Sequence, residues 1–206
     1  PTGRAAKRLS EATGFEAQTI HRLLAYNGHS RQFTHNEENP IKAHAVLIDE
    51  ASMIDIWLMD ALLSAVKSSC KLILVGDVDQ LPSVGPGRVL ADLIESTLFP
   101  VNRLTRVYRQ AMDSNIVKNA HRVNQSTVPK SCEKDQDASS QKDFFILYRS
   151  EAAAVTEGLI TIVKDRLPKL GFNPLKDIQI LTPMHSGQLG TSQLNQLLQE
   201  TLNPHG

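Results

Sequence analysis

Two short apolar runs constrain the fold more than any other feature of this sequence. Residues 45–48 and 72–75 are rich in Val, Ile and Leu, and each run is followed within a few residues by acidic side chains. Such runs are typical of strands that are buried on both faces of a parallel sheet. Between them, apolar residues recur at helical spacing from Ile54 to Val66. The order strand, helix, strand predicts a βαβ unit and therefore an α/β fold.

Apolar spacing and capping residues predict the remaining elements. We expect further helices over residues 3–13, 19–26, 87–95, 113–124, 152–167 and 191–202, and further strands over 144–148 and 178–181. Asp113 or Ser114 is the expected N-cap of the fourth of these helices, and Pro168 is the expected stop of the fifth. Residues 125–143 are rich in Ser, Lys, Asp and Gln, which predicts a surface loop or linker.

Composition argues against a membrane protein and against a disulfide-rich secreted one. The 22 Lys and Arg balance 22 Asp and Glu, no run approaches the roughly 18 apolar residues of a membrane span, and the first residues form no signal-peptide core. Cys70 and Cys132 are too few and too far apart for a disulfide framework. We expect a soluble intracellular protein with two free thiols.

The balanced charge hides an acidic block followed by a basic one. Residues 45–98 carry 8 Asp or Glu against 3 Lys or Arg, whereas residues 103–130 carry 6 Lys or Arg against 1 Asp. Taken alone, such blocks are most often the solvated faces of different helices. The motifs inside them decide whether they have a function.

The acidic block holds two candidate sets at the ends of the two strands. Asp49 and Glu50 directly follow the first strand, where α/β proteins place their sites. In such a Walker B arrangement the first carboxylate holds Mg²⁺ through water and the second orients the water that attacks a γ-phosphate. Gln80 follows the second strand, and its amide can bridge that phosphate and that water. The alternatives are a helix N-cap for the carboxylate pair and a simple capped turn for residues 77–82.

The basic block contains two arginines that are three residues apart. Arg106 and Arg109 would share one face of a helix, which suits guanidinium contact with phosphate oxygens. The alternative is that both arginines lie on a solvated helix face. For an isolated pair at this spacing, that alternative would be favoured.

These segments occur in the order of one known family. From residue 1 to residue 203 the chain resembles the RecD-like branch of superfamily 1 DNA helicases, the group that contains the helicase alpha subunit of exodeoxyribonuclease V. The resemblance rests on residues 1–9 (PTGRAAKRL) with 19–24 (TIHRLL) for motif Ia, 47–53 (LIDEASM) for motif II, 74–87 (LVGDVDQLPSVGPG) for motif III, 104–110 (LTRVYRQ) for motif IV, and 180–190 (ILTPMHSGQLG) with Leu194 and Asn195 for the start of a second RecA-like domain.

The resemblance implies an ATP-dependent DNA helicase that uses ATP and Mg²⁺, translocates 5′ to 3′ on single-stranded DNA and unwinds duplex junctions. The implied ATP-site residues are Asp49 for Mg²⁺, Glu50 for the attacking water, Gln80 as γ-phosphate sensor, Arg109 as arginine finger and Arg106 as a weaker candidate. The implied DNA contacts are Thr2, Gly3, Arg4, His21, Arg22, Thr182, Pro183, His185 and Gly187. For His21, local packing on its helix is an equally open interpretation.

The resemblance also implies a domain layout and a cellular setting. Residues 1–112 correspond to part of a first RecA-like domain (P-loop NTPase type, a parallel sheet with flanking helices), 113–143 to a helix and polar linker, and 144–206 to the start of a second RecA-like domain. The implied setting is DNA repair and recombination in a bacterial-type cytoplasm, associated with the nucleoid. Other subunits of an exonuclease complex are the implied protein partners, and no membrane is implied.

One feature of the family does not occur in these residues. The phosphate-cradling loop G-x-x-x-x-G-K-[ST] is not found, and the resemblance places it upstream of Pro1, with motifs V and VI downstream of Gly206. We therefore expect a central piece of a helicase that does not turn over ATP by itself. Two alternatives remain. The first is another kind of P-loop ATPase or nucleotide kinase, and the sequences of residues 76–87 and 108–110 argue against it. The second is a non-catalytic DNA- or partner-binding module, and the intact set of Asp49, Glu50, Gln80 and Arg109 argues against that.

Overall fold

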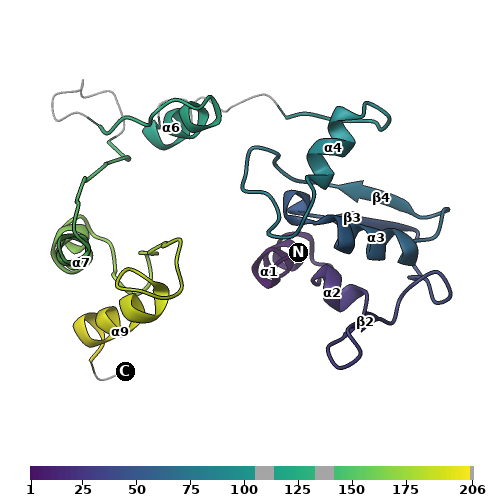
Figure 1. The fold of residues 1–206 in the computed structure, drawn as a ribbon, viewed down its shortest axis with the longest axis horizontal. Coiled ribbons are helices and arrows are strands. Elements are labelled where there is room, and N and C mark those ends of the chain that lie inside the picture. Colours follow the sequence, from purple (N-terminus) through teal and green to yellow (C-terminus); the bar gives the residue numbers. More distant parts are fainter. Residues whose placement is uncertain (105–113, 133–141, 205–206) are drawn as a thin grey trace. The chain divides into compact units, whose positions relative to one another are not determined.

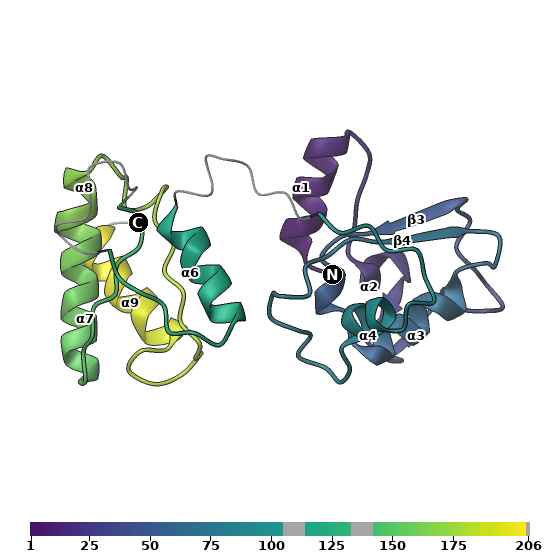
Figure 2. The same cartoon turned by 90° about the horizontal axis from the view of Figure 1, so that it is seen from above.

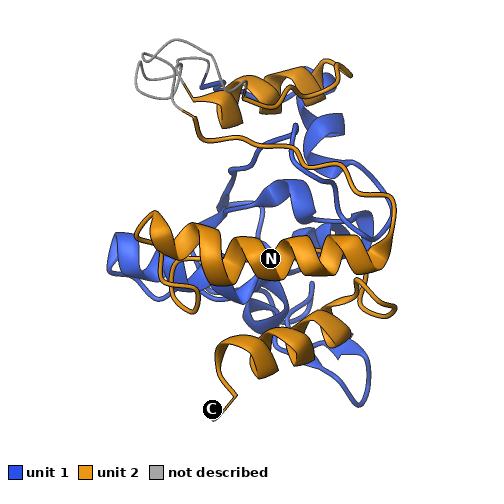
Figure 3. Cartoon of the chain, turned by 90° about the vertical axis from the view of Figure 1, so that its left-hand side faces the viewer, with its two compact units in different colours: residues 1–107 blue, residues 108–206 orange. Residues whose placement is uncertain are grey.

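In the computed structural model of the protein, residues 1–104, 114–132 and 142–204 are described. They fall into two compact units, residues 1–107 and 108–206, which Figure 3 colours separately. No helix within the described ranges is both long and apolar enough to cross a membrane.

The elements of each unit are labelled in Figure 1. The first unit contains helices α1 (Gly3–Thr13), α2 (Ile20–Leu23), α3 (Ile56–Ala65) and α4 (Val89–Glu95), the 3₁₀ turn η1 (Ala51–Met53), and strands β1 (Tyr26–Asn27), β2 (Gln32–Phe33), β3 (Ala45–Ile48) and β4 (Lys71–Leu74). The second unit contains α6 (Asn115–Asn124), α7 (Ala152–Thr161), the π-helical turn η2 (Ile162–Arg166), α8 (Leu167–Lys169) and α9 (Thr191–Leu202).

The core of the first unit is a pair of parallel strands connected by a helix. β3 and β4 pair in parallel with Ile48 opposite Leu74, and α3 lies between them in the chain. Helix α3 is capped by Asp55, whose carboxylate accepts a hydrogen bond from the N–H of Leu58 at 2.8 Å. The expected βαβ unit is therefore confirmed, with β4 displaced by one residue from the predicted range.

Only one face of this strand pair is buried, which corrects the expectation of strands covered on both sides. Val46 is 7% and Ile48 is 5% exposed, whereas Leu47 is 49% and Ile73 is 46% exposed. Helices α2, α3 and α4 all contribute to the core, and they lie on one side of the sheet in Figure 2. Helix α1 contributes no buried residue. Within the described residues, the opposite face therefore keeps its apolar side chains exposed.

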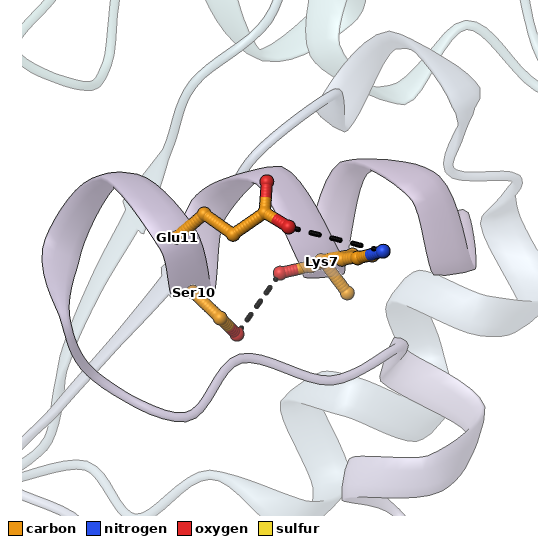
Figure 4. A network of polar contacts seen from close by, with 4 residues as sticks. Lys7, Ser10 and Glu11 are labelled. Atoms are coloured by element: carbon orange, nitrogen blue, oxygen red, sulfur yellow. Dashed lines mark hydrogen bonds and ion pairs between the residues drawn. The ribbon is translucent and has the colours of Figure 1, made fainter.

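Helix α1, which matches its predicted range, is held by local polar contacts rather than by burial. Ser10 Oγ donates to the Ala6 carbonyl at 3.1 Å, and Lys7 Nζ lies 3.9 Å from Glu11 Oε1. Figure 4 shows Lys7, Ser10 and Glu11 on this helix. An exposed ion pair of this kind contributes little to stability. The helix ends at Gly14, which has a φ of 73° that favours glycine.

The helix predicted over residues 19–26 is shorter than expected. Helix α2 is one turn long and is capped by Thr19. The chain then turns at Ala25 and forms an antiparallel hairpin in which Tyr26 pairs with Phe33. Aromatic residues favour strands over helices, and the cross-strand pair stabilises the hairpin.

In the second unit, α6 holds the first part of the polar segment 125–143. Asn119 is 3% exposed. Its Nδ2 donates to the Lys130 carbonyl at 2.8 Å, and its Oδ1 accepts from the Lys130 N–H at 2.7 Å. A buried amide that satisfies a backbone carbonyl and N–H together fixes the position of that segment.

The helical stretch that begins at α7 does not stop at Pro168, contrary to the prediction. In η2 the N–H of Leu167 donates to the Ile162 carbonyl five residues earlier, and Pro168 then lies in the first turn of α8. The wider π turn alters the hydrogen-bond register ahead of the proline ring, which would otherwise clash with a helical carbonyl. The helix ends instead at Lys169, and Gly171 follows with a φ of 92°, a conformation that favours glycine.

Neither of the two strands predicted in the second unit is formed. Residues 144–148 and 178–181 show no β pairing among the described residues. A strand needs a neighbouring strand to satisfy its backbone groups. The first of these segments instead accepts a bond from the Cys132 N–H at the Phe144 carbonyl (3.0 Å) and donates one from the Ile146 N–H to Ser131 Oγ (3.1 Å).

Asp143 caps α6 from the far end of the polar segment. Its carboxylate accepts hydrogen bonds from Ser114 Oγ at 2.6 Å and from the Asn115 N–H at 2.9 Å. The bond from Ser114 is the main cause that lowers the pKa of Asp143 below its usual range. A carboxyl group with a lowered folded-state pKa stabilises the fold above its unfolded pKa, and the contribution is lost as the pH falls through the folded value.

We predict that Asp143→Asn destabilises α6 at neutral pH and that the difference from the unchanged protein closes below about pH 4. Amide hydrogen exchange over residues 115–124 measures the first effect, and thermal unfolding at a series of pH values measures the second. Asp165→Asn on η2 is the matched control, because it removes one carboxylate without touching the cap. Unchanged exchange of α6 in Asp143→Asn would contradict the capping role.

Candidate functional site

Asp49 and Glu50 lie at the carboxyl end of β3, where the chain turns sharply out of the sheet. Glu50 has a left-handed backbone (φ 55°, ψ 41°), which costs a non-glycine residue roughly 1–3 kcal/mol. The turn brings the Glu50 N–H to 2.9 Å from Asp49 Oδ1 and leads into η1. Both residues are half-buried, and the Glu50 side chain makes no capping hydrogen bond to η1. The geometry thus gives no support to the N-cap interpretation of Glu50.

Backbone hydrogen bonds connect this turn to the end of β4. The Val75 N–H donates to the Ile48 carbonyl at 2.8 Å, and the Ala51 N–H donates to the Val75 carbonyl at 2.9 Å. The next residue, Gly76, lies very close to the backbone of η1. A Cβ built on Gly76 would lie 3.0 Å from both the Ala51 and the Ser52 nitrogens. Only glycine allows η1 to pack this closely onto the end of β4.

Gln80 lies in a turn that Asp77 organises. Asp77 Oδ1 accepts from the Asp79 N–H at 3.0 Å, and the Asp77 carbonyl accepts from the Gln80 N–H at 3.2 Å. Gln80 Nε2 is 3.5 Å from Asp77 Oδ2, and the Gln80 side chain is exposed. The capped turn named above as the alternative for residues 77–82 is therefore present. Because β3 and β4 end level with one another, this turn leaves the sheet at the edge that carries the carboxylate pair.

The rest of the motif III loop is anchored to the start of α3. Ser83 Oγ donates to the Gly85 carbonyl at 2.9 Å, and the Pro86 carbonyl accepts from the Ile56 N–H at 2.9 Å. Gly87 then has a φ of 97°, a conformation that favours glycine. The loop is thus tied to the sheet at one end and to α3 at the other.

The amino end of α1 lies within electrostatic range of Asp49 and Glu50. Thr2 caps α1, with Oγ1 accepting from the Ala5 N–H at 3.2 Å. The predicted DNA contacts of this segment are the half-buried Thr2 and the exposed Gly3 and Arg4.

His21 packs in an aromatic cluster on the hairpin. Its ring centroid lies 5.7 Å from that of Tyr26 and 5.8 Å from that of Phe33, and these two rings are 5.1 Å apart. This supports the local-packing interpretation of His21, while its neighbour Arg22 is exposed. Sequence reasoning missed the two hairpin aromatics. The signal that could have found them is an aromatic residue on each side of a short turn that contains glycine.

The predicted DNA contacts of the second unit share one loop, which precedes α9. Thr182 Oγ1 donates to the Leu189 carbonyl at 2.6 Å, and Gly187 has a φ of 93°. Pro183 and His185 are exposed in the same loop. Hydrogen bonds across the loop therefore hold these four residues in one structural element.

Two predicted site residues cannot be placed. Arg106 and Arg109 lie outside the described residues, so their roles stay predictions. Among the described candidates, the structure brings Asp49, Glu50 and the turn of Gln80 to one sheet edge, with the start of α1 close to the carboxylate pair.

The donor set of this edge fits a hydrated Mg²⁺ rather than a metal cage made by protein alone. Across residues 1–104, 114–132 and 142–204, no group of three or more His, Cys, Asp or Glu side chains gathers to hold a metal ion. Mg²⁺ usually keeps several waters and is bound by one or two carboxylates together with substrate phosphates. The Glu50 N–H engages Asp49 Oδ1, which leaves Oδ2 for such a contact.

Comparison with known proteins identifies the class to which this geometry belongs. Residues 1–86 match a family model described as an AAA domain. The chain is 37% identical over 204 residues to the ATP-dependent RecD2 DNA helicase of Deinococcus radiodurans, which covers 99% of this chain and 26% of that protein. It is 42% identical over 112 residues to the RecBCD enzyme subunit RecD of Mycolicibacterium smegmatis (46% of this chain, 20% of that protein) and 35% identical over 129 residues to that of Haemophilus influenzae (52% and 20%).

These matches confirm the expected P-loop, RecA-like type of α/β fold for the first part of the chain. The chain belongs to the RecD-like helicase family, as its motifs predicted. It spans about a quarter or less of the length of the curated relatives named above.

We predict that Gly76→Ala destabilises the first unit by about 1–3 kcal/mol, because the added methyl group overpacks the joint between η1 and β4. Gly28→Ala is the matched control, since a Cβ at Gly28 meets nothing within 4 Å, and its effect should stay within about 0.5 kcal/mol. Urea unfolding followed by circular dichroism measures both changes. Equal stability of the two variants would show that the close approach at Gly76 does not matter.

Proposed function

We propose that this chain is part of a DNA-helicase motor that couples ATP hydrolysis to movement along single-stranded DNA. The observation that carries the proposal is the sheet edge at which β3 presents Asp49 and Glu50 while β4, paired level with it, presents the turn of Gln80. Paired carboxylates beside a polar amide, at the carboxyl ends of adjacent parallel strands, suit the hydrolysis of a nucleotide γ-phosphate.

Each residue of this edge has a distinct role in the proposal. Asp49 holds Mg²⁺ through water, Glu50 orients the attacking water, and Gln80 senses the γ-phosphate by donating to it and accepting from that water. The Asp77 turn keeps the Gln80 backbone next to the end of β4, which supports a sensing role. When bound, Mg²⁺ would neutralise charge that develops on the phosphate oxygens.

DNA binding is assigned to the segments that the family motifs indicate. The exposed first turn of α1 and the loop before α9 carry groups that suit phosphate contact. We infer that movement runs from 5′ to 3′ and that the motor acts at duplex junctions. We also infer that residues 1–112 belong to a first RecA-like domain, that residues 113–143 are a helix and linker, and that a second RecA-like domain starts after them. All of these inferences rest on the resemblance.

The relatives suggest two modes of action for the longer protein. One is named as a helicase in its own right and others as subunits of the RecBCD enzyme, so we propose action either alone or with partner subunits in bacterial DNA repair. Residues 1–206 contain no G-x-x-x-x-G-K-[ST] loop. We therefore propose that the isolated chain does not turn over ATP and that hydrolysis requires a protein that also supplies such a loop.

We predict that Glu50→Gln, made in the longer protein, abolishes ATP hydrolysis but leaves nucleotide and DNA binding largely intact. The amide keeps the size of the side chain and removes the charge that orients the water. Steady-state phosphate release with and without single-stranded DNA measures turnover, and Asp60→Asn on the exposed side of α3 is the control. Normal turnover in Glu50→Gln would remove Glu50 from catalysis.

For Arg109→Ala we predict a loss in kcat on the order of 10³-fold, which is typical of a missing arginine finger. Single-turnover hydrolysis at saturating ATP measures the loss. Arg106→Ala is the comparison, and its effect should be smaller. A loss below about tenfold for Arg109→Ala would indicate a structural role instead.

A further inference from the structure

The loop before α9 folds back onto the first turn of that helix. The Thr191 N–H donates to the Met184 carbonyl at 3.0 Å, and the Ser192 N–H donates to the His185 carbonyl at 3.2 Å. Helix N-termini leave such N–H groups without helical partners, and the loop carbonyls satisfy two of them. The loop is therefore attached to a twelve-residue helix at the position of His185.

A glycine makes this close crossing possible. A Cβ built on Gly190 would lie 2.6 Å from the His185 carbonyl oxygen and 2.6 Å from the Ser186 carbonyl carbon. Gly190 is buried, whereas His185 itself is exposed. The backbone beneath the His185 ring is thus closely packed, while the ring faces solvent.

The His185 ring is held by a side chain of α9. Its Nδ1 lies 2.8 Å from Thr191 Oγ1. A hydroxyl group can both donate and accept, so Thr191 can donate to the neutral ring and accept from the protonated one. In both states Nε2 is the remaining ring nitrogen, and it carries a proton that it can donate.

His185 is also the only source of positive charge in this part of the chain. Residues 182–199 contain no Asp, Glu, Lys or Arg. The nearest charged residues along the sequence are Asp177, which accepts a hydrogen bond from the Asn173 N–H, and Glu200, which accepts from Gln196 Nε2. No acidic side chain of the loop or of the first two turns of α9 therefore faces the imidazole.

We propose that Thr191 is a positioning residue that holds the His185 ring so that Nε2–H donates to a phosphate of single-stranded DNA. This inference rests on the proposed function, which places the loop at the DNA. Protonation of His185 adds charge to this contact.

The test uses the longer protein that carries this chain, with a fluorescent oligothymidylate as the probe and anisotropy as the readout. Four forms are compared at pH 6 over a range of salt concentrations: the unchanged protein, His185→Gln, Thr191→Val and Thr191→Ser. Valine keeps the shape of threonine without the hydroxyl group, and serine keeps the hydroxyl group. Circular dichroism verifies folding, and Thr191→Ala replaces Thr191→Val if that variant fails to fold.

At pH 6 we expect His185→Gln and Thr191→Val to bind about tenfold more weakly than the unchanged protein, and Thr191→Ser to bind normally. The salt dependence of His185→Gln should fall by about 0.7 in log–log slope, the value for one lost phosphate contact on a single strand.

Two results would overturn the inference, and they can be told apart. Weak binding by His185→Gln together with normal binding by Thr191→Val would remove the positioning role and leave the DNA contact in place. Unchanged binding by His185→Gln would remove the loop from the DNA interface. In that case the ATP-site part of the proposed function would still stand, because it depends on residues of the other unit.

Discussion

The pairing of β3 with β4 is the interaction on which the rest of the candidate site depends. Hydrogen bonds continue past the strand ends, from the Val75 N–H to the Ile48 carbonyl and from the Ala51 N–H to the Val75 carbonyl. These bonds place two polar segments that are far apart in the sequence at one edge. The strained backbone of Glu50 and the close approach of Gly76 to η1 follow from the same hydrogen-bonded connection between the ends of β3 and β4. Backbone hydrogen bonds therefore position the residues of the site, and the side chains then supply its chemistry.

The sequence predicted those features that depend on local chemistry. The range of β3, the helices α1 and α9 and the order of the motifs follow from apolar spacing, caps and short polar patterns. One-sided burial of the sheet was not predictable, because a short apolar run has the same pattern whether one face or two are covered. Pro168 was misjudged because a π turn ahead of a proline leaves no simple sequence signal.

Long-range side-chain contacts account for most of what sequence reasoning missed. Asp143 caps α6 across a polar segment, and Asn119 fastens the other end of that segment. Neither pairing follows from spacing, since each joins residues more than ten positions apart. The packing of the His21 ring was missed for a different reason, since its neighbours lie on a hairpin that replaced part of a predicted helix. The position of Asp49 and Glu50 at a sheet edge was easier to predict, because they directly follow a strand, whereas their catalytic roles stay predictions.

The most direct test of the account is whether motifs II and III respond to nucleotide as one unit. Amide hydrogen exchange of the longer protein, with and without a non-hydrolysable ATP analogue and Mg²⁺, reports on residues 47–53 and 74–87 separately. The account predicts that the amides of both segments become protected from exchange together when the nucleotide binds, because backbone hydrogen bonds connect the two segments. Binding of the analogue with no change in either segment, or with protection of only one, would contradict it.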